Sequence, residues 1–90
     1  MSNVNQLNLN VTVAIRRVEE AQQKLAHAEL AIAIATSPTS TEGRIARRGA
    51  ISAARESRLD GWVEELLKRF LAEDGIDDKL RAELKALAQG

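Results

Sequence analysis

Apolar residues recur in an unbroken heptad register over the first third of the chain. A seven-residue repeat with two apolar positions keeps those positions on one side of an α-helix. After Leu7 the second apolar position of each repeat is alanine, so the seam is narrow and another helix can approach it closely. The pattern predicts a long first helix, clear from about Val11 to Ala35. The register is formed by Val4, Leu7, Val11, Ala14, Val18, Ala21, Leu25, Ala28, Ile32 and Ala35.

Residues 4–13 also fit a second pattern. Apolar and polar residues alternate from Leu7 to Val13, and a period of two is typical of a half-buried strand. These residues are therefore expected to form either the start of the helix or a short strand or arm. A short polar strand followed by helices resembles the start of a ribbon–helix–helix DNA-binding protein, although the helix that follows in this chain continues to Ala35 before any turn.

The segment 36–41 is rich in serine and threonine, contains the one proline, and predicts a turn between two helices. It carries two overlapping helix-start patterns, Ser37 followed by Pro38, and Thr39 followed by Glu42 three residues later. A second helix is expected to begin between Ser37 and Glu42, antiparallel to the first because the loop is short. The small residues expected to face the alanine seam are Ala46, Gly49, Ala50, Ala53 and Ala54.

The C-terminal third changes from small apolar residues to large ones. Asp60 and Gly61 fit either the cap of a third helix or a bend in a continuous one. Gly75 suits the left-handed residue past a helix end, and Asp77 suits the N-cap of a final helix. The third helix is expected to carry a broad apolar face, and the last helix a narrower stripe: Leu59, Trp62, Val63, Leu66, Leu67, Phe70 and Leu71, then Ile76, Leu80, Leu84 and Leu87.

These patterns predict a single helical domain over residues 1–90 with an all-α fold. The expected architecture is an antiparallel helical hairpin extended into a small three- to four-helix bundle, with a short N-terminal strand or arm as the alternative for residues 4–13. A chain of this size buries a thin core. We therefore expect a homo-oligomer, formed through the heptad seam or through the broad apolar face.

The residues that commonly carry catalysis are few. The chain has no cysteine, and His27 has no second histidine at metal-ligand spacing. Its paired carboxylates are adjacent in sequence, and adjacent residues on a helix diverge by about 100°. The glycines are scattered and form no phosphate loop. We expect a protein that is not an enzyme, holds no metal or cofactor and contacts no membrane, and the lack of cysteine favours the cytoplasm.

Arginines are concentrated in the middle of the chain. Residues 37–58 hold five arginines and two glutamates, whereas residues 59–90 hold five basic and eight acidic side chains. Arginine binds carboxylates and phosphates through two parallel hydrogen bonds. The cluster therefore indicates either a binding surface or a helix face that pairs with acidic residues of the same chain. Its members are Arg44, Arg47, Arg48, Arg55 and Arg58.

The expected function is a non-catalytic protein–protein interaction module, a small regulator, inhibitor or adaptor of the kind that bacteria and phages encode. The five arginines would orient the acidic surface of another protein, and Trp62 and Phe70 would supply apolar contacts. Binding of nucleic acid or nucleotide through the same arginines is an alternative, which the zero net charge and the acidic C-terminal third disfavour. A structural subunit of a helical assembly is a further alternative.

Overall fold

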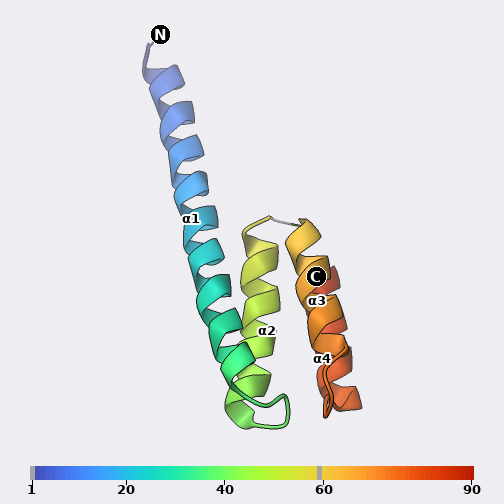
Figure 1. Cartoon of the computed structure of the whole chain (residues 1–90). Coiled ribbons are helices and arrows are strands. Elements are labelled where there is room, and N and C mark those ends of the chain that lie inside the picture. The colour runs from blue at the N-terminus through green and yellow to red at the C-terminus, as the bar shows by residue number, and fades with distance from the viewer. Residues whose placement is uncertain (1, 59) are drawn as a thin grey trace.

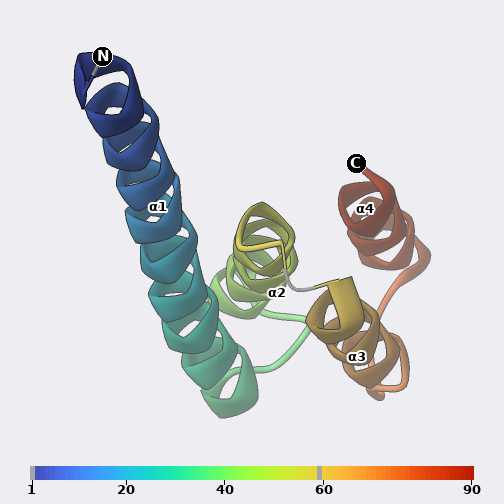
Figure 2. The ribbon, with the colours of Figure 1, turned by 90° about the horizontal axis from the view of Figure 1, so that it is seen from above.

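The computed structural model of the chain describes residues 2–58 and 60–90, with side chains for 14–58 and 61–90. Four helices follow one another in this part of the chain: α1 (Ser2–Ala35), α2 (Thr41–Glu56), α3 (Asp60–Leu71) and α4 (Asp78–Gln89) (Figure 1). α1 and α2 form an antiparallel hairpin, and α3 and α4 pack on the other side of α2 (Figure 2). The predicted all-α fold, a hairpin extended into a small bundle, is confirmed.

The strand or arm considered for residues 4–13 is wrong, because α1 is helical from Ser2 onward. A strand must pair its main-chain groups with a second strand. The described residues contain no strand that could supply this pairing. A helix forms the main-chain hydrogen bonds within one segment, so residues 4–13 follow the heptad pattern rather than the period of two.

α1 extends far beyond the rest of the bundle. The molecule measures 59 × 22 × 18 Å, and its long dimension follows α1. α2 ends beside the middle of α1, so the N-terminal part of α1 projects past it (Figure 1). The ribbon shows no other helix beside this projecting part (Figure 1).

Ser40 is the N-cap of α2, and its hydroxyl accepts a hydrogen bond from the Gly43 N–H at 2.9 Å. The helix begins within the predicted interval, but neither Ser37 nor Thr39 is the cap. Ser37 forms the turn before it, where its carbonyl accepts hydrogen bonds from the backbone N–H and the hydroxyl of Ser40. A Cβ atom on Gly43 would collide with this carbonyl, so glycine is required there.

The core is centred on α2, which has helices on two sides. α2 packs against α1 on one side and against α3 and α4 on the other (Figure 2). Small side chains allow the helix axes to approach closely, as the sequence predicted. The buried apolar residues are Ala26, Ala33, Ala46, Ala50, Ile51, Ala53, Ala54, Val63, Leu66, Phe70, Leu80 and Leu84.

The face of α1 that packs against α2 differs from the predicted one. Ala26 and Ala33 are buried there, whereas Ala21 and Ala28 of the heptad seam are exposed. Alanine therefore occupies a second set of positions seven residues apart, one that the heptad pattern did not single out. α2 is fixed on this second face by a hydrogen bond from its Arg47 to the carbonyl of Ala33 at 2.9 Å.

The C-terminal half follows the predicted pattern closely. α3 begins as a separate helix at Asp60, so the bent continuous helix is wrong. Gly75 has a φ of +86°, the left-handed conformation predicted for it. The Asp77 carboxylate caps α4 by accepting the Leu80 N–H at 2.7 Å. Within the predicted stripe Leu80 and Leu84 are fully buried; Leu59 of the broad face lies outside the described residues.

Candidate interaction surface

Four of the five predicted binding arginines form ion pairs within the chain, and three of these pairs are close contacts. Arg44 donates to Asp77 at 2.7 Å, and Arg48 donates to Glu83 at 2.6 Å. Both pairs join α2 to the start and the middle of α4. The acidic C-terminal third is thus the partner of the basic middle, which is the internal pairing that the sequence left open.

Arg47 lies in the core, with only 1% of its surface exposed. Its Nε and Nη2 atoms donate to the two carboxylate oxygens of Glu73 at 2.7 and 2.6 Å. Further hydrogen bonds reach the carbonyls of Gly43, Ala33 and Thr36. The guanidinium therefore ties the start of α2 to the end of α1 and to the loop after α3. A side chain in this position cannot orient an external partner.

The ion pairs perturb the carboxyl groups that take part in them. The hydrogen bond from Arg44, followed by the Leu80 N–H, holds the pKa of Asp77 below its ordinary value of 3.8. The hydrogen bond from Arg48 lowers the pKa of Glu83 from its ordinary value of 4.5. Both carboxylates are therefore stabilised in their charged form by contacts that exist only in the folded chain.

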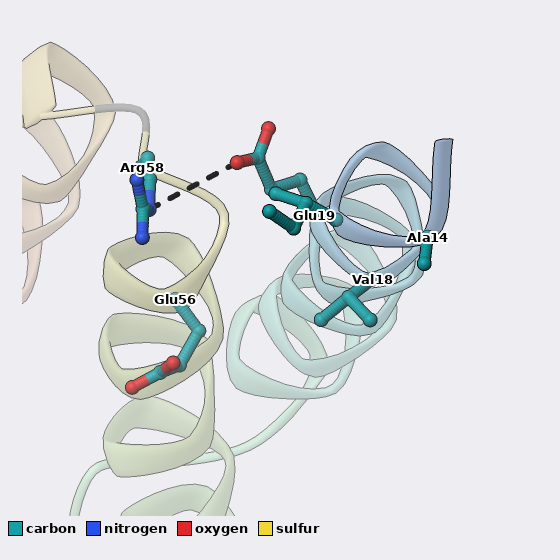
Figure 3. A pocket seen from close by; sticks show the side chains of 6 residues that line it. Ala14, Val18, Glu19, Glu56 and Arg58 are labelled. Atoms are coloured by element: carbon teal, nitrogen blue, oxygen red, sulfur yellow. Dashed lines mark ion pairs between the residues drawn. The ribbon is translucent and has the colours of Figure 1, made fainter. Parts of the chain in front are cut away.

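Arg55 and Arg58 are the exposed members of the cluster. The Arg55 guanidinium lies against Gly90 at the end of α4. Arg58 follows α2 with a φ of +61°, and its side chain is 79% exposed. Its Nε atom lies 3.9 Å from a carboxylate oxygen of Glu19 on α1, which makes a loose surface pair (Figure 3). The predicted arginine surface is therefore reduced to two separated residues.

Trp62 and Phe70 do not form a joint binding surface. Phe70 is 1% exposed and lies beneath the Arg47 guanidinium, with 5.7 Å between the guanidinium carbon and the ring centroid. Trp62 is half-buried, and its ring lies 4.6 Å from the ring of His27 on α1. Both aromatic residues thus hold the bundle together, and His27 packs as a ring against Trp62.

Among the side chains that the structure describes, five of the six large apolar residues that are exposed lie on α1. The α1 seam, defined here as the heptad positions from residue 14 to residue 35, faces away from the core. Val18 is 59% exposed, Leu25 46% and Ile32 45%. The sequence pattern predicted that these residues share one face of α1. The prediction that α2 packs on this face is wrong, because α2 packs on the face of Ala26 and Ala33. The alanines of the α1 seam, which are exposed between the larger residues, are Ala14, Ala21, Ala28 and Ala35.

Two hollows border the α1 seam where α1 meets α2. The upper one lies at the end of α2, where Val18 of α1 and Glu56 of α2 project to the same side of the hairpin (Figure 3). The lower one lies near the loop, between Ile32 of α1 and Ile45 of α2, and Ile45 is itself 54% exposed. Apolar surface therefore continues from the α1 seam onto the edge of α2.

Opposite charges flank the α1 seam. Arg17 and Lys24 are exposed and occupy the heptad positions just before the larger apolar residues, which places them on the edge far from α2. Glu29 occupies the edge near α2, where its carboxylate lies against Gly49. Glu42 and Glu56 of α2 line the two hollows on this near side. Arg58 also lines the upper hollow. On α1 itself the far edge is therefore basic at Arg17 and Lys24, and the near edge is acidic at Glu29.

The described residues contain no group of three or more histidine, aspartate or glutamate side chains placed to hold a metal ion. Within the same part of the chain, no helix combines the length and the apolar character that crossing a membrane requires. Comparison with protein-family models, with curated proteins and with solved structures finds no match to this chain.

Proposed function

We propose that this chain is a non-catalytic protein–protein interaction module, of the adaptor or regulator type, that contacts its partner through the α1 seam. The observation that carries the proposal is the row of exposed apolar side chains at Val18, Leu25 and Ile32. Contiguous exposed apolar surface bordered by polar residues is typical of sites where proteins bind other proteins. We place its action in the cytoplasm, which the absence of cysteine supports.

The spacing of these side chains favours a helix as the partner. They recur every seven residues with alanine between them, so large side chains alternate with shallow depressions along the surface. An apolar helix can seat its own side chains in such depressions. A single exposed isoleucine or leucine needs no explanation, but three in one register on one face do.

The arginine helix supports this function indirectly, by building the scaffold. Arg44, Arg47 and Arg48 are held by carboxylates of the same chain. The nucleic-acid alternative rested on five arginines, and these three would have to leave their partners to bind a phosphate. We therefore rank that alternative below the protein interaction.

A structural subunit of a helical assembly is the second candidate, and the projection of α1 beyond α2 favours it. A helix that leaves its own bundle offers a long surface to neighbouring subunits. This candidate uses the same α1 seam, so the two functions differ in the partner rather than in the surface.

The test is affinity capture from a lysate of the source organism, treated with nuclease, with the parent chain and two variants as bait. Leu25→Glu places a charge on the α1 seam. Ile34→Glu is the matched control, because Ile34 is 60% exposed on the same helix and lies outside the seam. We expect a stoichiometric protein with the parent and with Ile34→Glu, and its loss with Leu25→Glu. Equal capture by both variants would refute the proposal.

A further inference from the structure

We propose that a second copy of this chain occupies the α1 seam, with the two α1 helices parallel and in register as a two-stranded coiled coil. The inference rests on the proposed function, since it names the partner of the same surface. Three observations carry it: the residues of the seam, the charges on its two edges, and the projection of α1.

The residues of the α1 seam suit self-pairing. In a parallel pair each heptad position meets the same position of the other helix. Val18, Leu25 and Ile32 would meet their own copies. Val18 and Ile32 are β-branched, and β-branched residues at this position favour two strands. The intervening alanines, Ala21 and Ala28, let the two helices approach closely.

The charged edges of the seam select the parallel orientation. In a parallel pair the edge far from α2 on one helix faces the edge near α2 on the other, with an offset of about five residues. Lys24 of each copy then faces Glu29 of the other, and Arg17 faces Gln22. An antiparallel pair would set basic edge against basic edge and acidic edge against acidic edge, which is destabilising.

The projecting part of α1 gives an independent reason for the same orientation. Most helical stability in proteins comes from the tertiary packing of one face, and no other helix of the chain lies beside the projecting part (Figure 1). In a parallel pair the two projecting parts run side by side, and the heptad register of the sequence extends into them at Val4, Leu7 and Val11. In an antiparallel pair they would point in opposite directions and remain without each other's support.

The folded hairpin leaves room for this partner. Leu25 and Ala26 are neighbours in sequence, so their side chains diverge by about 100° around α1. Ala26 is fully buried against the hairpin while Leu25 is 46% exposed. A second α1 can therefore pack on the seam without displacing α2.

Because the chain contains no cysteine, single-cysteine variants of the full chain test both the partner and the orientation. Ala21→Cys and Ala28→Cys each place a thiol in the seam, and Ile34→Cys is the control outside it. In a glutathione redox buffer we expect both seam variants to form the symmetric disulfide dimer and Ile34→Cys to remain largely monomeric. Residues seven apart can both meet their own copies only when the helices are parallel and in register.

Cross-linking at one seam position alone, at neither, or equally at Ile34→Cys would overturn the inference. These outcomes leave the proposed function to its own test, because a heterologous partner could still be captured by the parent chain and lost with Leu25→Glu. The charge pairing between the two edges is tested separately by sedimentation. Lys24→Glu should weaken the affinity of self-association about tenfold, and Lys24→Glu combined with Glu29→Lys should restore it. Equal association of all three chains would contradict the assigned edges.

Discussion

Arg47 shows how a residue that looks like part of a surface patch can belong to the core. Its guanidinium contacts both oxygens of Glu73 and the carbonyls of Gly43, Ala33 and Thr36. The sequence could not separate it from the neighbouring arginines, because spacing along a helix says which residues share a face and not what covers that face. Its acidic partner, Glu73, lies 26 residues away, just past the end of a helix, where a charged residue is expected to be exposed to solvent.

Removing the Arg47 charge should destabilise the protein strongly. Arg47→Met would keep much of the side-chain volume but leave Glu73 and buried carbonyls without their donors, a change that costs about 3 to 5 kcal/mol in comparable buried pairs. Arg55→Met is the control, since Arg55 is exposed. Urea unfolding followed by circular dichroism should show a large drop in the free energy of unfolding for Arg47→Met alone. Similar values for the two variants would contradict the anchoring role of Arg47.

At the scale of helices, the sequence predicted most of the architecture. The N-cap of α4 follows from a local residue, and Asp77 and Gly75 act as their positions indicated. The rotation of α1 about its own axis did not follow. Alanine occurs on both the seam and the buried face, so composition does not choose between them. The choice depends on tertiary hydrogen bonds such as the one from Arg47 to Ala33.

Enlarging an alanine of α1 should therefore matter on one face only. Ala33 is 1% exposed against α2, whereas Ala31 is exposed. Ala33→Leu would overpack the interface and lower the free energy of unfolding by about 1 to 3 kcal/mol. Ala31→Leu should change it little. Thermal unfolding of the two variants measures the difference, and a destabilised Ala31→Leu beside an unchanged Ala33→Leu would show that α1 is rotated differently.

The two ion pairs between α2 and α4, Arg44 with Asp77 and Arg48 with Glu83, form a clamp that should make the protein sensitive to acid. Asp77 and Glu83 have a lower pKa when folded than their ordinary values of 3.8 and 4.5. Their contribution is therefore present above the ordinary values and is lost as the pH falls through them toward the folded values. The double variant Asp77→Asn with Glu83→Gln keeps a capping residue at the start of α4 and cannot titrate there.

The expected result is a difference in slope. The melting temperature of the parent should fall more steeply than that of the double variant between about pH 5 and pH 2.5. Thermal unfolding by circular dichroism over that range provides the measurement. If the melting temperatures of the two proteins fall in parallel as the pH is lowered, the ion pairs of the clamp contribute nothing to the loss of stability in acid.

At the scale of the whole molecule, the bundle is a scaffold that holds one long helix with its heptad seam outward. The sequence identified the heptad seam, and its prediction that the chain associates stays a prediction. It placed the binding residues on α2 and α3, where the structure uses most of them internally. Arginine and tryptophan are common at the centres of protein interfaces, so these residue types were the ones predicted to bind a partner. Exposure of a valine, a leucine or an isoleucine depends on where the other helices pack, and only the folded chain shows it.

Sedimentation equilibrium of three full-length chains tests this account most directly. Ile32→Glu and Ile34→Glu make the same substitution two residues apart, on the α1 seam and outside it, at positions that are 45% and 60% exposed. We expect the parent and Ile34→Glu to sediment with twice the chain mass of 9.8 kDa, and Ile32→Glu to sediment as the monomer. A parent that stays monomeric, or an Ile32→Glu variant that associates as well as Ile34→Glu, would contradict it.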